Sequence, residues 1–198
     1  RRPARVIRSS KPICRSEGAV VTRQQQTPSI DFTILTLKDA LDLAVLIEEE
    51  ARDRYEELSA QLVLHRTPGA AAFFAKMVRI EELHRKQLIE QRHKAFGDAP
   101  VGVRREMIFD VEAPGYDEVR MNMTTRQALE TALKSEEKAH AFFVSVLHNV
   151  QNPEVRKLFE ELRDEEVEHQ ELVKAELAKL PPGDPLERFD VGDGPAPQ

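Results

Sequence analysis

The chain has 198 residues, of which 40% are hydrophobic and 32% charged, and its net charge of −6 gives no indication of a nucleic-acid partner. It is long enough for one domain with a substantial core, and the absence of tryptophan with only 6% aromatic residues favours helices over sheets. A single cysteine, Cys14, excludes an internal disulfide and any paired-cysteine metal site, and no run approaches the ~20 apolar residues of a membrane span, so we expect a soluble, cytoplasmic protein.

The first segment, residues 1–34, differs from the rest of the chain in charge. It has six arginines and one lysine against one glutamate and one aspartate, a charge of +5 that leaves −11 for the remainder. With three prolines and no helical period, it is predicted to be a disordered basic arm, and a targeting role for it stays open. Residues 181–198 are rich in proline and glycine and predict a flexible acidic tail, which leaves a single domain over residues 35–180.

Four helices are predicted between these ends from their N-terminal capping signals. Thr36 precedes a run with apolar periodicity, and Thr67 stands directly before a proline, a residue favoured in the first turn of a helix. Thr124 and Gln127 form a capping-box pattern, and Asn152 again precedes a proline. The predicted helices cover residues 37–63, 68–96, 125–150 and 153–180.

The lengths of the connections predict how these helices are arranged. Short links join the first pair and the second pair, so each pair is expected to form an antiparallel hairpin. Residues 97–123 form a much longer link, as a crossover along a bundle requires. We therefore predict an all-α fold, an antiparallel four-helix bundle of two helical hairpins joined by a long crossover.

Each predicted helix carries one glutamate in the middle of its apolar seam. Alternating steps of four and three residues along helix 153–180 pass through apolar residues and then through Glu166 and His169. Because such positions face the partner helices, both side chains are predicted to point inward, whereas the neighbouring Glu165 and Glu168 are predicted to face solvent. The same steps on the other helices select four further inward-pointing residues, Glu48, Glu81, His84 and Glu136.

The two hairpins repeat each other in register. The seam glutamate follows the cap by twelve residues in helices 37–63 and 125–150, and by fourteen in helices 68–96 and 153–180. This regularity indicates an internal duplication, which predicts that the four glutamates lie at one level of the bundle.

Four carboxylates at one level of a core require a counter-charge. Burying an unpaired ion costs several kcal/mol, against a total stability of about 5–15 kcal/mol for a domain. The seam contains no lysine or arginine, so the charge has to come from outside the chain, and two divalent metals would balance four ionised glutamates. Carboxylates with one imidazole per metal and no thiolate favour iron, with manganese as an alternative.

The motifs on these helices resemble the rubrerythrin-type branch of the ferritin-like superfamily over residues 36–180. Glu48, Ala51 and Tyr55 match the family's E-x-x-A-x-x-x-Y helix, which favours Glu48 over the adjacent glutamates. Glu136 and Ala139 match the corresponding E-x-x-A of the third helix, and the even helices carry Glu81-x-x-His84 and Glu166-x-x-His169.

The resemblance implies a di-iron oxidoreductase that oxidises ferrous iron with hydrogen peroxide or dioxygen. It implies that Glu48 and Glu136 are terminal ligands and that Glu81 and Glu166 bridge the metals. It further implies that each of the two histidines ligates one iron and that Tyr55 orients a carboxylate.

The chain also departs from the rubrerythrin pattern. The rubredoxin-like domain is missing, so electrons are expected from an external donor or from ferrous iron itself. An extra glutamate of the family is replaced by Ala139, and the counterpart of Tyr55 in the second half is Phe143. A ferroxidase feeding an iron store, or a bundle docked as cargo to a larger assembly, remains the alternative, and we expect a homo-oligomer, a dimer or larger.

Overall fold

The computed structural model describes residues 30–64, 67–107, 111, 112, 114 and 123–181. Over these residues the chain forms four long helices and one short 3-10 helix, without a strand. The predicted all-α four-helix bundle is confirmed, and the helix bounds differ from those expected by at most three residues. The elements are α1 (Leu37–Leu64), α2 (Pro68–Phe96), η1 (Arg105–Met107), α3 (Thr125–Leu147) and α4 (Pro153–Lys179).

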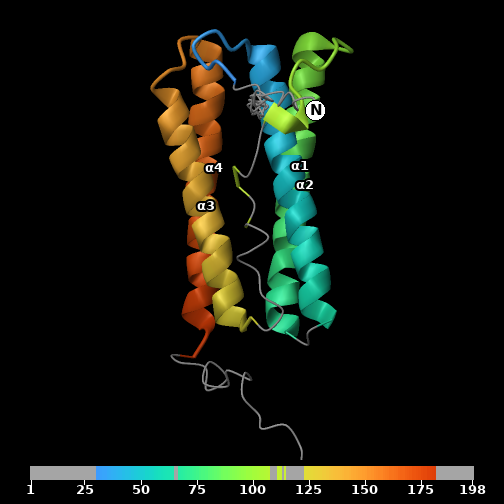
Figure 1. The fold of residues 1–198 in the computed structure, drawn as a ribbon, viewed down its shortest axis with the longest axis vertical. Helices are drawn as coiled ribbons and strands as arrows, with labels where there is room; N and C mark the ends of the chain where they lie inside the picture. The colour runs from blue at the N-terminus through green and yellow to red at the C-terminus, as the bar shows by residue number, and fades with distance from the viewer. Residues whose placement is uncertain (1–29, 65–66, 108–110, 113, 115–122, 182–198) are drawn as a thin grey trace, which may run out of the picture.

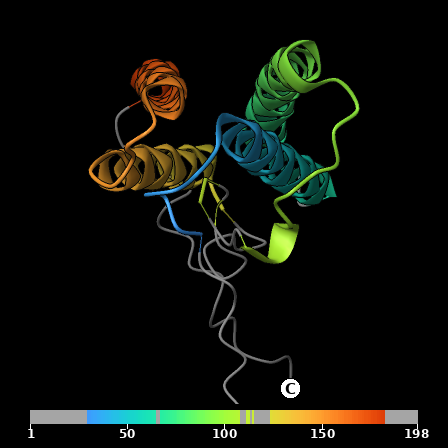
Figure 2. The same cartoon turned by 90° about the horizontal axis from the view of Figure 1, so that it is seen from above.

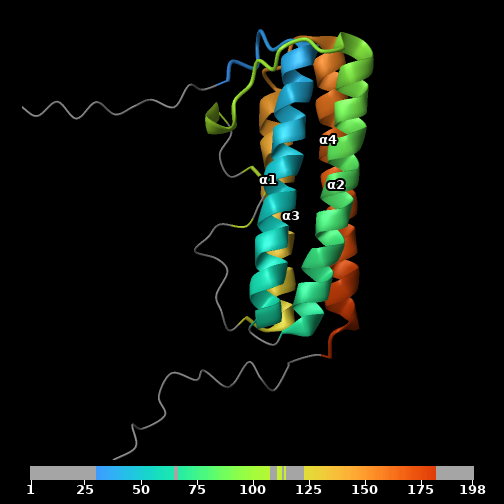
Figure 3. The ribbon, with the colours of Figure 1, turned by 90° about the vertical axis from the view of Figure 1, so that its right-hand side faces the viewer.

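The helices form two closely packed hairpins, α1 with α2 and α3 with α4. The hairpins stand beside each other with their long axes nearly aligned (Figures 1 and 3). Viewed along the bundle, the four helices surround a common centre (Figure 2). α2 ends at one end of the bundle and α3 begins at the other, as a long crossover requires (Figure 1).

Three of the four predicted N-terminal caps are present. Thr36 Oγ1 accepts a hydrogen bond from the backbone of Asp39 at 3.1 Å, and Thr124 forms the complete capping box with its partner glutamine. Asn152 Oδ1 accepts a bond from the backbone N–H of Glu154 at 2.9 Å. The prediction for Thr67 is wrong, because its hydroxyl makes no cap hydrogen bond and donates instead to the carbonyl of Met123 at 3.3 Å.

A buried ion pair fastens the start of the crossover to the first hairpin. Asp42 on α1 is buried and accepts hydrogen bonds from Arg92 Nε on α2 at 2.7 Å and from the backbone N–H of Gly102 at 3.0 Å. Arg92 also donates to the carbonyl of Gly97, the residue that ends α2 with a φ of +55°. Only glycine adopts this backbone conformation readily, so Gly97 lets the chain leave the helix towards Asp42.

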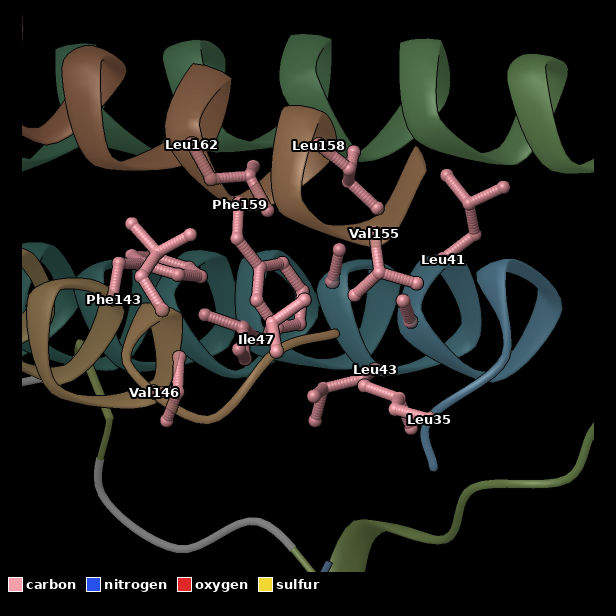
Figure 4. Close-up of a cluster of buried hydrophobic side chains, with 14 of the residues drawn as sticks. Leu35, Leu41, Leu43, Ile47, Phe143, Val146, Val155, Leu158, Phe159 and Leu162 are labelled. Carbon is pink, nitrogen blue, oxygen red and sulfur yellow. The ribbon is translucent and has the colours of Figure 1, made fainter. Parts of the chain in front are cut away.

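The apolar core consists of two clusters stacked along the bundle. The first cluster fills the end near the start of α1 and includes Leu41, Phe143 and Phe159 (Figure 4). The second cluster fills the other end and includes Phe74 and Leu129. On each helix, the seam glutamate lies in the sequence between residues of the first cluster and residues of the second, so the core is interrupted by a polar layer.

Contacts with the bundle begin before residue 35, where we expected the domain to start. Phe32 packs edge-on against Phe142 and Phe159, with ring centroids 6.0 and 6.3 Å apart. Of the expected arm (residues 1–34) and the expected tail (residues 181–198), residues 1–29 and 182–198 lie outside the described residues. Among the described helices, none has a stretch long and apolar enough to cross a membrane.

Candidate metal centre

The seam residues selected from the sequence meet in the polar layer between the two apolar clusters. Each helix contributes one glutamate with at most 4% exposure, and the even helices add the imidazoles, one buried on α4 and one half-buried on α2. Glu48 is buried, whereas the adjacent Glu49 and Glu50 are only partly so. The glutamates are Glu48 on α1, Glu81 on α2, Glu136 on α3 and Glu166 on α4, and the histidines are His84 and His169.

Three overlapping groups of described residues place metal-binding atoms within 4.8 Å of one another. Glu166 belongs to none of these groups, but its Oε2 lies 3.8 Å from Nδ1 of His169. The groups are Glu81, His84 and His169; then Glu81, Glu112, Glu136 and His169; and finally Glu48, His84 and Glu165.

The two imidazoles face each other across the layer. Their rings stack in parallel, with centroids 5.2 Å apart and an interplanar angle of 4°. Nδ1 of His169 lies 3.2 Å from Oε2 of Glu136, while its Nε2 has no hydrogen-bond partner. Nδ1 of His84 is also without a partner and lies 4.0 Å from Oε2 of Glu81. Each histidine therefore offers one free ring nitrogen to a metal.

A tyrosine orients one of the carboxylates. Tyr55 on α1 is completely buried, its hydroxyl donates a hydrogen bond to Oε1 of Glu136, and its ring stacks on Phe74 with centroids 5.5 Å apart. Phe143, the counterpart of Tyr55 in the second half, is buried in the first apolar cluster and has no hydroxyl to offer. The hydroxyl of Tyr55 therefore supports Glu136, and position 143 in the second half offers no equivalent hydrogen bond.

The polar atoms of this layer match what bound metal ions require. With the carboxylates ionised, eight buried oxygen and nitrogen atoms of the layer have no hydrogen-bond partner. Buried polar atoms are nearly always paired, so such a concentration fits a metal-binding site, and carboxylate oxygens with imidazole nitrogens suit iron or manganese. The atoms are Oε2 of Glu48 and Glu166, both carboxylate oxygens of Glu81 and Glu112, Nδ1 of His84 and Nε2 of His169.

Comparison with known proteins agrees with this geometry. The family model for rubrerythrin matches residues 39–177. The chain belongs to the rubrerythrin family. A crystal structure of an uncharacterised conserved protein from Magnetospirillum magnetotacticum MS-1 is 27% identical, with a TM-score of 0.58, and the match covers 76% of this chain and 99% of that one. A search of curated proteins found no match.

Burial makes the layer of this rubrerythrin-family chain hard to ionise in the absence of a metal. Burial raises the pKa of Glu48 to about 8, against the opposing attraction of His169. It also raises the pKa of three further glutamates well above the ordinary range, and repulsion among the carboxylates adds to the effect. These three are Glu81, Glu112 and Glu166.

The surroundings of the two histidines shift their pKa values in opposite directions. Burial, helped by the nearby His169, lowers the pKa of His84 to about 4. For His169, burial acts in the same downward direction but is outweighed by the hydrogen bond and charge of Glu136, so its pKa is raised. His84 is thus neutral at pH 7, the form in which an imidazole binds metal.

Two carboxylates at the centre were not anticipated from the sequence. Glu112 comes from the crossover between α2 and α3 and is only 2% exposed, although helical periodicity gives no information on a residue in a loop. The prediction that Glu165 faces solvent is wrong, since it is half-buried and burial raises its pKa. Position along α4 alone could not reveal this, because ligand atoms of Glu48 on α1 and His84 on α2 lie within 4.8 Å of its carboxylate.

A small pocket reaches the layer between α2 and α4. Its volume is about 70 Å³, and it is lined by His84 and Glu165 together with Gln87, Gln91 and Glu161. A cavity of about 10–15 Å³ on the same measure holds one water molecule, so the pocket admits species of the size of dioxygen, hydrogen peroxide or a metal ion.

Proposed function

We propose that this chain binds two iron ions in the layer of buried glutamates and histidines and uses them to reduce hydrogen peroxide. The observation that carries the proposal is the set of eight buried, unpartnered ligand atoms in the layer. Without metal, that many polar atoms would oppose folding, whereas two cations would satisfy most of them at once. The family's usual di-iron chemistry supports the same reading.

Membership of the rubrerythrin family suggests how the ligands would be shared. Glu48 and Glu136, from the odd helices, would each bind mainly one iron, and Glu81 and Glu166, from the even helices, would bridge the pair. The two histidines would each bind one iron. Tyr55 would hold Glu136 in place through the hydrogen bond to Oε1, as partners of metal ligands commonly do.

Bound ferrous iron would supply the chemistry of the reaction, two electrons that, with two protons, would reduce hydrogen peroxide to two water molecules. The chain's own residues provide the setting for this reaction. The apolar clusters on both sides of the layer keep bulk water out, and the pocket beside His84 gives a small oxidant a way in. An external electron donor, or ferrous iron itself, would return the centre to the ferrous state.

One observation favours a ferroxidase as a second candidate. The pocket that reaches His84 is lined by two glutamates, Glu161 and Glu165, which would attract ferrous iron as a substrate rather than as a resident cofactor. In that case, dioxygen would be the oxidant and ferric iron the product passed to a store.

The metal content tests the proposed centre first. Anaerobic titration with ferrous iron should end at two ions per chain, and Glu166→Gln or His169→Ala should lower that number because each removes a ligand. Glu168→Gln is the matched control, since Glu168 is exposed on the same helix. Loss of iron from the control to the same extent as from Glu166→Gln would contradict the assignment of the inward face.

The oxidant is tested by rapid mixing. The diferrous protein, mixed with equal concentrations of hydrogen peroxide or dioxygen, should form the ferric absorption faster with hydrogen peroxide. Oxidation at least as fast by dioxygen would reject the peroxide reductase in favour of the ferroxidase.

A further inference from the structure

Glu112 lies outside both halves of the repeat, yet its side chain reaches the polar layer. It belongs to the crossover between α2 and α3, where it is 2% exposed, and the preceding Val111 packs into the first apolar cluster. A carboxylate oxygen of Glu112 lies within 4.8 Å of ligand atoms of Glu81, Glu136 and His169. The crossover thus adds a fifth fully buried carboxylate to the four seam glutamates, whereas Glu165 at the edge of the layer is only half-buried.

No group in the described part of the chain forms a hydrogen bond with this carboxylate. Both oxygens of Glu112 are buried and without a hydrogen-bond partner. Ordinary buried acids in this protein look different, as Asp42 shows: it is bound by Arg92, Lys38 and a backbone N–H. An unpartnered carboxylate in a dry core costs several kcal/mol, so a purely structural role for Glu112 is unfavourable.

We propose that Glu112 is a further metal ligand, supplied by the crossover to only one side of a centre that is otherwise built by a twofold repeat. This inference rests on the proposed function. The centre would then hold five carboxylates and two imidazoles. Because α1, α2, α3 and α4 contribute equivalent ligands while Glu112 has no counterpart on them, one of the two metals would be bound more tightly than the other.

The charge balance of the centre indicates which oxidation state of the two metals Glu112 would favour. Two divalent ions carry +4 against −5 for five carboxylates, whereas two trivalent ions carry +6. The added carboxylate therefore favours the more highly charged pair, and its removal should raise the reduction potential of the iron centre.

Anaerobic binding of Co²⁺ tests the ligand role without relying on activity. The wild type should bind two Co²⁺ ions with unequal affinity. Glu112→Gln, which keeps the size of the side chain, should weaken one of the two by at least about tenfold, the lower end of the losses seen when partners of metal ligands are mutated. The visible absorption of that Co²⁺ should also intensify, because fewer ligands surround it. Glu106→Gln, at an exposed position of the same crossover, is the matched control.

Thermal unfolding separates a ligand from a buried structural acid. Apo Glu112→Gln should unfold at the same temperature as the wild type or higher, and Co²⁺ should raise the unfolding temperature less than it does in the wild type. Equal Co²⁺ affinities and equal absorption for the two proteins would overturn the ligand role and leave the dinuclear centre standing. A wild type that binds no Co²⁺ and no ferrous iron would overturn the proposed function instead.

Discussion

Glu136 is the most constrained carboxylate of the centre. Its Oε1 accepts a hydrogen bond from Tyr55 on α1, and its Oε2 lies 3.2 Å from Nδ1 of His169 on α4. One side chain of α3 is therefore held from both hairpins. Such fixed orientation is what a metal ligand needs, because a preorganised carboxylate loses little freedom when the ion binds.

Tyr55→Phe should reveal the strength of this support. The substitution keeps the ring on Phe74 but leaves a buried oxygen of Glu136 without its donor, which should lower the free energy of unfolding of the apo protein by ~1–3 kcal/mol. Chemical denaturation of the two apo proteins measures the difference. Because Tyr55 is not itself proposed as a ligand, iron stoichiometry should stay at two per chain. Unchanged stability would mean that the hydrogen bond to Glu136 contributes nothing to folding.

The helices begin at positions with different kinds of support. Thr124 caps α3 with both bonds of a capping box, at 3.2 Å to the backbone N–H of Gln127 and 2.9 Å back from its side chain. Thr67 precedes α2 without capping it, and the proline that follows has no N–H to satisfy. Two threonines with similar sequence signals are thus expected to contribute differently to the stability of the helices that they precede.

Alanine substitution of the two threonines tests this difference. Thr124→Ala should lower the free energy of unfolding by about 1 kcal/mol, the usual value for the loss of an N-cap. Thr67→Ala loses only a long hydrogen bond to the carbonyl of Met123, so its effect should be smaller, roughly 0.5 kcal/mol or less. Equilibrium denaturation in urea compares them, and an equal or larger loss for Thr67→Ala would show that this residue does cap α2.

At the scale of the whole molecule, the bundle is an apolar core divided by a charged layer. The two apolar clusters favour folding, while the unpartnered polar atoms of the layer between them would oppose it until cations bind. The metal-free and metal-loaded proteins should therefore respond to pH in opposite ways.

The metal-free protein should be most stable at mildly acidic pH. The pKa of Glu48 is raised from 4.5 to about 8, so between these values the folded protein holds a proton that the unfolded chain has lost. Each such glutamate lowers the free energy of unfolding by about 1.4 kcal/mol per pH unit as the pH rises through this window. Glu81, Glu112 and Glu166 act in the same direction, because their pKa values are also raised.

The histidines modify this profile without reversing it. The pKa of His84 is lowered to about 4, so its contribution to stability is lost as the pH falls below 6.5. His169, whose pKa is raised, contributes in the same direction as the glutamates. Chemical denaturation of apo protein at about pH 5.5 and pH 8 should give the higher stability at the lower pH. Saturating metal should reverse the order because it requires deprotonated ligands. A flat apo profile over this range would contradict a cluster of buried carboxylates.

The sequence alone determined the helices and the inward face of each. Apolar residues recur with a helical period, so the glutamates and histidines that interrupt the seam could be recognised before the structure was known. The capping residues placed the starts of the helices, and the equal distances from cap to glutamate placed Glu48, Glu81, Glu136 and Glu166 at one level. These features depend on neighbouring residues or on a regular spacing along the chain, so the amino-acid sequence alone is enough to detect them.

Only the tertiary structure showed which residues outside the apolar seams of the helices come close to the polar layer. Glu112 lies in a loop, where no period relates sequence position to direction, and its burial depends on how the crossover packs against the bundle. Glu165 lies off the seam of α4, but ligand atoms of Glu48 on α1 and His84 on α2 lie within 4.8 Å of its carboxylate. Thr67 has the sequence of a cap, but its hydroxyl turns to the carbonyl of Met123 instead. In each case the deciding contact comes from a distant part of the chain, whose position is set by packing rather than by neighbouring residues.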